Sequence, residues 1–398
     1  MAYKLEIFLE ELSKFSAEGP GVTRIAFTKE SRQGWDYICQ TMKNIGLTVK
    51  TDVYGTVLGH LEGQKKESVM IGSHYDSVVQ GGKYDGAAGI AIGLAVAAHF
   101  AEKGIKPAYS LNVLATNDEE GGTFTNGFLS SKYMCGLLQE EECKNAMTGK
   151  TLKEFLAEQW YTKDGRGADD LCLATAGKNI VQYIEPHIEQ GGILWDSQEQ
   201  VGIVKHIIGI TRLYVTVNGE SNHAGTTPMN KRKDAMVAAS RMICSIPDMV
   251  CPYQGEVATV GQISCNPNAS NVIPNEVKFS VDIRSANNED MKNLTMDIRE
   301  MVARESVAGF DIVQGESELA IPMNNDLVHR MEEICKKQGI TYRVMNSGAG
   351  HDAQLFAINL DTVMLFVPSK NGISHSPEEF TRTKDMEQAV RILVDYLS

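Results

Sequence analysis

Val69-Met-Ile-Gly-Ser-His-Tyr-Asp76 is a short apolar run that ends in a histidine and an aspartate. The apolar run predicts a buried strand over 69–73. An alanine-rich segment at 90–102 predicts a helix, and 111–116 predicts a second strand that runs into Asn117-Asp-Glu-Glu-Gly121. Strand, crossover helix and strand predict an α/β layer with a mostly parallel sheet.

The middle of the chain has a different order of predicted strands and helices. Strands are predicted over 212–217, 257–264, 276–284 and 310–314, with helices over 233–245 and 288–303. This βαββαβ order is that of the ferredoxin-like unit. The last part of the chain returns to the alternation of helix and strand seen in the first part, with helices predicted over 326–338 and 385–396 and a strand over 362–367. We therefore expect an α/β domain formed by 1–208 and 322–398, interrupted by an inserted α+β domain over 209–321.

Composition excludes several classes of protein. The 398 residues include 38 Lys and Arg against 51 Asp and Glu, for a net charge of −13. Such an acidic chain is a poor candidate for binding nucleic acid or an anionic membrane. No apolar run approaches the ~20 residues of a membrane span. The amphipathic pattern of Met1–Phe15 predicts a surface helix rather than a signal peptide, and hence a cytoplasmic protein.

Histidines and carboxylates in polar, glycine-rich surroundings are the candidate functional residues. They are His74, Asp85, Glu119, Glu120, His187 and His375. Imidazole and carboxylate together suit zinc, manganese or cobalt. Asp76 is two residues beyond His74 and is expected to accept the other ring N–H of that histidine. Each residue taken alone is more typical of a structural role, so the residues by themselves leave a metal site and structural roles both open.

The adjacent pair Glu119-Glu120 suggests a division of labour. Neighbouring side chains of an extended chain point in opposite directions. One carboxylate can therefore bind metal while the other faces a metal-bound water as general base, which is the arrangement that hydrolysis needs.

Seven motifs follow one another along the chain. They are Gly72-Ser-His-Tyr-Asp-Ser-Val, Gly81-Gly-Lys-Tyr-Asp-Gly, Asp118-Glu-Glu-Gly, His187-Ile-Glu-Gln-Gly, Asn222-His-Ala-Gly-Thr-Thr-Pro-Met, Ser347-Gly-Ala-Gly-His-Asp-Ala and Ile373-Ser-His-Ser-Pro-Glu-Glu. In this order they resemble the hydantoinase/carbamoylase amidases of the M20 metallopeptidase clan. That family includes allantoate amidohydrolases, N-carbamoyl-L-amino acid hydrolases and β-ureidopropionases.

The resemblance implies a catalytic domain with two divalent metal ions, Zn²⁺ or Mn²⁺, and an inserted lid that also forms a homodimer. Asp85 would bridge the ions and Glu119 would be the base. The other implied ligands are His74, Glu120, His187 and His375.

The resemblance also implies residues for a small anionic ureido substrate. Asn271 and Arg284 would bind its carboxylate, and His223 would polarise the scissile carbonyl, reaching the site of a neighbouring subunit. Gly350 and Gln190 are further candidates for substrate contacts.

The motif at 218–229 looks most like that of allantoate amidohydrolases, and Arg212 suits the polar pocket that allantoate needs. N-carbamoyl-L-amino acid hydrolysis is the alternative, with β-ureidopropionase activity beside it. A catalytically dead relative that binds a metabolite is the alternative outside enzymes. Thr123 stands where many members have an arginine, which leaves the details of the pocket open.

Overall fold

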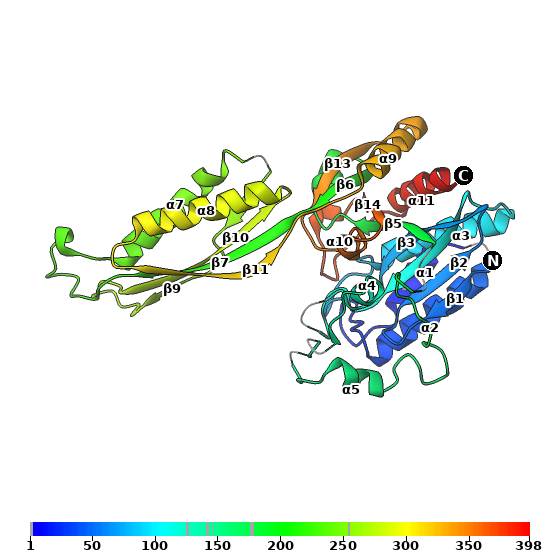
Figure 1. Cartoon of the computed structure of the whole chain (residues 1–398), viewed down its shortest axis with the longest axis horizontal. Coiled ribbons are helices and arrows are strands. Elements are labelled where there is room, and N and C mark those ends of the chain that lie inside the picture. Colours follow the sequence, from blue (N-terminus) through cyan, green and yellow to red (C-terminus); the bar gives the residue numbers. More distant parts are fainter. Residues whose placement is uncertain (1–2, 125–126, 141–142, 146, 176–178, 254) are drawn as a thin grey trace. The chain divides into compact units, whose positions relative to one another are not determined.

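The chain forms two compact units. Figure 1 shows a computed structural model, which describes residues 3–124, 127–140, 143–145, 147–175, 179–253 and 255–398. One unit comprises Met1–Lys205 and Met323–Ser398, and the other comprises His206–Pro322. The sequence placed the two boundaries at 208/209 and 321/322. Among the described residues, no helix is long and apolar enough to cross a membrane.

A mixed sheet forms the centre of the first unit. Within the described residues its strand order is β1-β2-β4-β3-β5-β14-β6-β12, and β13 also pairs with β6. The strands are β1 (Thr48–Thr51), β2 (Val57–Leu61), β3 (Lys65–His74), β4 (Tyr109–Thr116), β5 (Ile180–Ile188), β6 (Val201–Ile207), β12 (Ile321–Pro322), β13 (Tyr342–Ser347) and β14 (Asp361–Val367). The neighbours β4, β3, β5 and β14 are parallel, whereas β1 with β2, β2 with β4, β14 with β6, and β6 with β12 are antiparallel. The mostly parallel sheet expected from the sequence is thus its central part.

Helices cover this sheet. They are α1 (Leu5–Ser13), α2 (Lys29–Ile45), α3 (Ala87–Lys103), α4 (Leu129–Met134), α5 (Leu152–Ala157), α6 (Ile193–Ser197), α9 (Asn325–Gln338), α10 (Asp352–Phe356) and α11 (Thr383–Leu397). Helix α3 packs on β3, β4 and β5, and α1, α2 and α11 pack on α3. The side chain of Thr28 accepts the N–H of Ser31 at the start of α2, and Gly46 ends that helix at φ 101°. These are the usual signals for helix ends.

The second unit is a sheet covered by two helices. Its elements are β7 (Gly209–Asn218), α7 (Ala235–Val250), β8 (Val257–Thr259), β9 (Ile263–Asn266), β10 (Glu276–Ser285), α8 (Asn288–Glu305) and β11 (Phe310–Glu318), with a short 3₁₀ turn at Met229–Lys231. Within the described residues the strand order is β11-β7-β10-β8, β9 also pairs with β10, and all of these neighbouring strands are antiparallel. The single strand predicted over 257–264 is therefore wrong: it is broken around Gly261, where Ser280 N–H donates to Gln262 O at 3.1 Å.

Alternation along the strands decides which face of this second sheet is buried. Leu213, Val215 and Val217 of β7 point into one core with alternate residues of β10 and with Leu294 and Ile298 of α8. Side chains between them point to the opposite face. Arg212 of β7 and Arg284 of β10 lie on that opposite face.

Candidate metal centre

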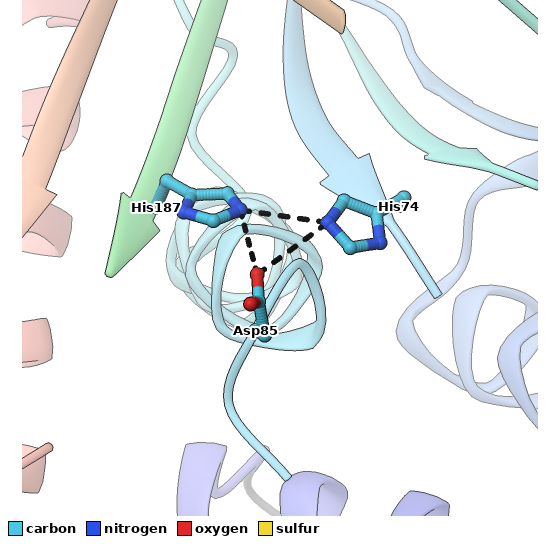
Figure 2. Close-up of side chains that lie close together, drawn as sticks. All are labelled: His74, Asp85 and His187. Atoms are coloured by element: carbon cyan, nitrogen blue, oxygen red, sulfur yellow. Dashed lines mark hydrogen bonds and ion pairs between the residues drawn. The ribbon is translucent and has the colours of Figure 1, made fainter. Parts of the chain in front are cut away.

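Two neighbouring strands and one loop bring together a group of three buried side chains in the first unit. His74 is the last residue of β3, and His187 lies near the end of β5. Asp85 lies just before α3. Figure 2 shows the Asp85 carboxylate and the two imidazoles pointing toward one another. Asp85 Oδ1 is 3.1 Å from His187 Nε2 and 3.6 Å from His74 Nε2.

The other oxygen of Asp85 faces a second group. Asp85 Oδ2 is 3.2 Å from His375 Nε2, and His375 Nε2 is 3.5 Å from Glu120 Oε2. Within each group, the candidate ligand atoms lie within 4.8 Å of one another. The structure thus brings together all five residues that the sequence suggested as ligands, with Asp85 common to both groups.

Backbone carbonyls orient the two buried imidazoles. His187 Nδ1 is 2.9 Å from Ile188 O, and His74 Nδ1 is 3.1 Å from Asp76 O. If each Nδ1 carries the proton, each Nε2 presents a lone pair to Asp85 and to the other ring, and the two Nε2 atoms are 3.5 Å apart. The Asp76 carboxylate, expected to accept the His74 N–H, is 3.7 Å from that nitrogen. The expected residue is therefore right but the expected atom is wrong, because the backbone carbonyl of Asp76 is closer to His74 Nδ1 than its carboxylate is.

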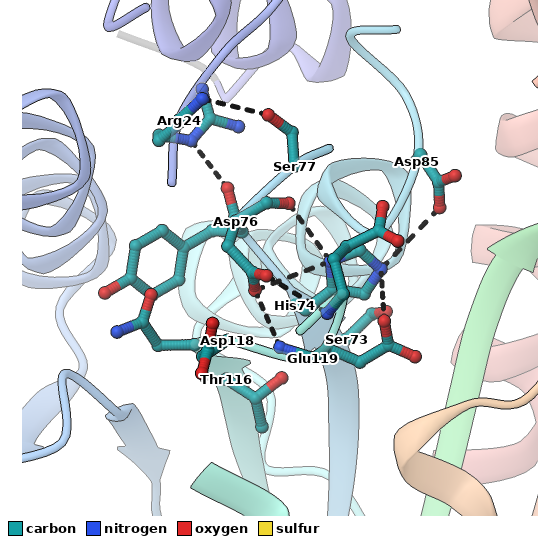
Figure 3. A network of polar contacts seen from close by, with 12 residues as sticks. Arg24, Ser73, His74, Asp76, Ser77, Asp85, Thr116, Asp118 and Glu119 are labelled. Carbon is teal, nitrogen blue, oxygen red and sulfur yellow. Dashed lines mark hydrogen bonds and ion pairs between the residues drawn. The ribbon is translucent and has the colours of Figure 1, made fainter. Parts of the chain in front are cut away.

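The Asp76 carboxylate instead fixes the Glu119-Glu120 segment. It accepts the backbone N–H of Glu119 at 3.1 Å and that of Glu120 at 3.2 Å. Figure 3 shows this link between the segment after β3 and the segment after β4, together with Asp118. Asp118 has φ 59°, so the chain turns sharply where the two glutamates begin. Glu119 Oε2 ends 3.8 Å from His74 Nε2, while Glu120 belongs to the group with His375.

Gly86 has no room for a side chain. Its φ is 61°, and a Cβ atom there would lie 2.5 Å from the ring of His74. Only glycine allows α3 to begin this close to the histidine while Asp85 points at it.

Negative charge dominates the surroundings of the site. Asp76, Asp118, Glu119 and Asp352 are all buried, and Arg24 is the only buried Lys or Arg among the described residues. Buried charges need partners or a metal ion.

The carboxyl pKa values reflect this crowding. Burial alone would raise the pKa of Asp85, but the neighbouring imidazoles of His187, His375 and His74 hold the pKa of that carboxyl well below its usual range. Burial raises the pKa of Glu120 to about 7 and that of Glu119 well above its usual range.

The residues present fit divalent metal ions. Asp85 Oδ1 and Glu120 Oε1 are buried oxygens that have no hydrogen-bond partner in the part of the chain that the structure describes. Imidazole nitrogens and carboxylate oxygens are ligands that zinc and manganese accept. His74, Asp85 and His187 would hold one ion, and Asp85, Glu120 and His375 another.

A third buried group supports His187 and is not a separate metal site. It consists of Glu185, His187 and His351. His187 already uses Nδ1 on Ile188 O and Nε2 on Asp85. The two Glu185 oxygens accept from Ser73 Oγ at 2.8 Å and from Ala353 N at 2.7 Å, and the His351 ring packs on His187 with centroids 4.5 Å apart.

Three other sequence candidates of the first unit have defined places. Gln190 donates from Nε2 to Asp85 Oδ2 at 2.9 Å, so it contacts the shared carboxylate. Gly350 is exposed in the loop before His351. Thr123 is buried, and its hydroxyl donates to Ala26 O at 2.8 Å. Its backbone N–H donates to Asp118 Oδ1 at 2.9 Å, so Thr123 stabilises the turn before the glutamates.

The substrate candidates of the second unit fall into two separate places. Arg212 Nη2 donates to Asp282 Oδ2 at 2.7 Å, and Arg284 Nε donates to Asp282 Oδ1 at 3.0 Å, so the arginines share one carboxylate. His223 pairs with Val272 in an isolated antiparallel β-bridge. Asn271 is the neighbour of Val272, in the loop that precedes β10.

The two places are too far apart to meet on one small molecule. Arg284 pairs with Ile210, at the beginning of β7, whereas Glu276 pairs with Asn218 at its end. Eight residues of strand span about 26 Å. Asn271 precedes Glu276 in the chain, so Asn271 and Arg284 of one copy are too far apart to bind the same small carboxylate.

Sequence reasoning missed several residues that support the site. Glu185, His351, Asp352 and Glu379 are buried close to the ligands. His351 and Asp352 stood in the quoted motif at 347–353, and Glu379 in the one at 373–379. The sequence feature that could have identified these three residues is an acid or a histidine within a motif that already contained a candidate site residue.

Comparison with known proteins identifies the family. The model of peptidase family M20/M25/M40 matches residues 58–398. An N-carbamoyl-L-amino-acid amidohydrolase of Paenarthrobacter aurescens is 34% identical, over 99% of this chain and 96% of its own length. An allantoate amidohydrolase of Escherichia coli (strain K12) is 35% identical, over 98% of this chain and 95% of its own length. The crystal structure of a hydantoinase/carbamoylase family amidase from Burkholderia multivorans matches with a TM-score of 0.89 and 31% identity, over 98% of this chain and 95% of that one.

The fold and these matches define a hydrolase of C–N bonds. The chain belongs to the M20/M25/M40 peptidase family.

Replacing Asp85 tests the shared ligand. Because the two oxygens of Asp85 face both groups, we expect Asp85→Ala to lose both metal ions. Mn²⁺ affinity should fall by more than ~100-fold, the upper limit typical of losing a residue that only orients a ligand. Metal content is measured after reconstitution with Mn²⁺ and desalting. Asp326→Ala, at an exposed aspartate of α9, is the matched control. Full metal content in Asp85→Ala would contradict the shared role.

Proposed function

We propose that this protein hydrolyses the ureido group of a small carboxylate at a two-metal centre, and that allantoate is its substrate. The observation that carries the proposal is Asp85, whose oxygens face His74 and His187 on one side and His375 on the other. Relatives named for allantoate and for N-carbamoyl-L-amino acids support the choice of a ureido substrate. The products from allantoate would be ureidoglycine, ammonia and CO₂.

Glu119 is the general base of this proposal. Divalent ions, when bound, polarise a carbonyl and make water more acidic. Glu119 lies outside the two ligand groups that contain Asp85, and its carboxylate is buried 3.8 Å from the His74 ring. Its backbone is fixed by Asp76, so its carboxylate is held in place to take a proton.

The second unit supplies substrate contacts in this proposal. Arg284 binds the carboxylate, with Arg212 beside it on the other oxygen of Asp282. A guanidinium suits this task because it can donate two parallel hydrogen bonds to a carboxylate.

His223 and Asn271 complete the substrate contacts from a second copy of the chain. The distance along β10 separates them from Arg284 of their own copy. The proposal therefore includes a homodimer formed through the inserted unit, in which one copy gives Arg284 and its partner gives His223 and Asn271.

N-carbamoyl-L-amino acid hydrolysis is the second candidate. It is supported by the N-carbamoyl-L-amino-acid amidohydrolase that matches 99% of this chain. It would use the same metal centre and the same base, and Arg212 is the residue that we expect to separate the two candidates.

A substrate panel tests the proposal. We expect kcat/KM for allantoate to exceed that for ureidoglycolate, N-carbamoyl-L-amino acids and N-carbamoyl-β-alanine, because Arg212 offers a polar partner to the second ureido group. Ammonia release by the Mn²⁺-loaded and Zn²⁺-loaded protein is the measurement. A preference for N-carbamoyl-L-amino acids would select the second candidate.

Glu119→Gln separates the base from the ligands. The amide keeps the shape of the side chain but cannot take a proton, so we expect kcat to fall by ~10²–10⁴-fold. Metal content should stay at the wild-type value, whereas Glu120→Gln should bind less metal. The two roles are reversed if Glu119→Gln loses metal and Glu120→Gln keeps it.

Arg284→Ala tests the carboxylate contact. Loss of a charge-assisted hydrogen bond costs ~1.5–3 kcal/mol, so kcat/KM should fall by about 10–100-fold with metal content unchanged. Arg284→Lys should restore little, because an ammonium lacks the fork geometry. Arg241→Ala, at an exposed arginine of α7, is the control. Unchanged kinetics in Arg284→Ala would place the carboxylate contact elsewhere.

A further inference from the structure

Glu379 is a buried glutamate that is not one of the metal ligands. Its Oε1 accepts the backbone N–H of Tyr84 at 2.9 Å and that of Asp85 at 3.0 Å. Ser374 Oγ lies 3.2 Å from Glu379 Oε2 and 3.0 Å from Asp85 Oδ2. One carboxylate therefore contacts the loop before α3 and, through Ser374, the loop that carries His375.

We infer that Glu379 is a positioning residue that clamps these two loops, and that binding of the metal ion between Asp85, Glu120 and His375 depends on the clamp. The inference rests on the proposed two-metal centre and adds to it a residue to which no role had been assigned.

The loop before α3 is built around this carboxylate. A Cβ atom on Gly82 would lie 2.1 Å from Glu379 Oε1, so a side chain at 82 would displace the glutamate. The segment around Glu379 is itself tied down beyond β14, since Thr381 Oγ1 donates to Pro368 O at 2.7 Å and Lys370 N donates to Phe380 O at 2.9 Å. Glu379 is thus held near the end of β14 and in turn fixes the backbone of Asp85.

His375 is the ligand that most needs such support. Its side chain is 48% exposed, against 1% for His74 and His187. Its backbone has φ 53°, outside any helix or strand. His74 and His187, by contrast, belong to β3 and β5, and backbone carbonyls hold their rings. Loss of the clamp should therefore release the ion at His375 before the ion at His74 and His187.

Glutamine should replace Glu379, because the clamp needs hydrogen bonds rather than charge. The amide oxygen of glutamine can accept the two backbone N–H groups. Its NH₂ can donate to Ser374 Oγ, which then gives its own proton to Asp85. Alanine removes both sets of contacts.

Mn²⁺ binding to the full-length protein tests the inference. The wild type should bind two Mn²⁺ per subunit after reconstitution and desalting. Glu379→Ala should keep one, with affinity for the second lowered by about 10–100-fold in a chelator competition, the range seen for groups that orient ligands. Glu379→Gln should bind two as tightly as the wild type. Glu378→Ala is the matched control, because Glu378 is the adjacent glutamate and is exposed.

Each other outcome has a definite meaning. Two tightly bound Mn²⁺ in Glu379→Ala would overturn the clamp, and so would a Glu379→Gln variant as weak as the alanine variant. A wild type that binds fewer than two Mn²⁺ would instead contradict the two-metal proposal. If Glu379→Ala does not fold, Ser374→Ala takes its place: weaker binding of the second Mn²⁺ supports the clamp, and unchanged binding overturns it.

Discussion

The Asp85 carboxylate, buried among three imidazoles, is the interaction around which the first unit is arranged. A buried carboxylate is costly without partners or a metal ion, and here the neighbouring imidazoles come from distant parts of the chain. His74 and His187 come from the ends of adjacent parallel strands, and His375 comes from a loop after β14. The parallel centre of the sheet is what makes this meeting possible, because parallel strands end at one edge.

The strongest elements of the fold could be predicted from apolar runs and breaker residues. The segments around β3, α3 and β4 carry long buried runs, and these strands and this helix form as expected. Strand β5 was missed, because Glu185-Pro186-His187 looks like a loop and proline cannot donate to a sheet. The structure tolerates Pro186 because the pairing of β5 with β3 extends only to Ile184. Short edge strands such as β1 have too little pattern to be recognised.

The site could be predicted in residue type but not in direction. Gaps between ligand residues reveal no geometry, so the residues alone left structural roles open and the seven motifs were needed. Asp76 shows the limit: spacing placed it beside His74, but only coordinates show that its carbonyl faces the ring while its carboxylate holds Glu119 and Glu120. Arg284 and Asn271 show another limit. The resemblance assigned both to one carboxylate, although the strand predicted over 276–284 already separates them by about 26 Å.

Gly86 has a chemical consequence for the lifetime of the protein. Among pairs that begin with aspartate, Asp-Gly cyclises most readily, because the unhindered glycine nitrogen can attack the aspartyl carboxyl and leave an isomerised backbone. The His74 ring forbids any larger residue at 86, so this labile pair cannot be avoided at Asp85. The folded site protects this pair, because Gln190, Ser374 and the histidines hold the carboxylate in place. Isomerisation at this pair would therefore damage the one carboxylate that both groups of candidate ligands share.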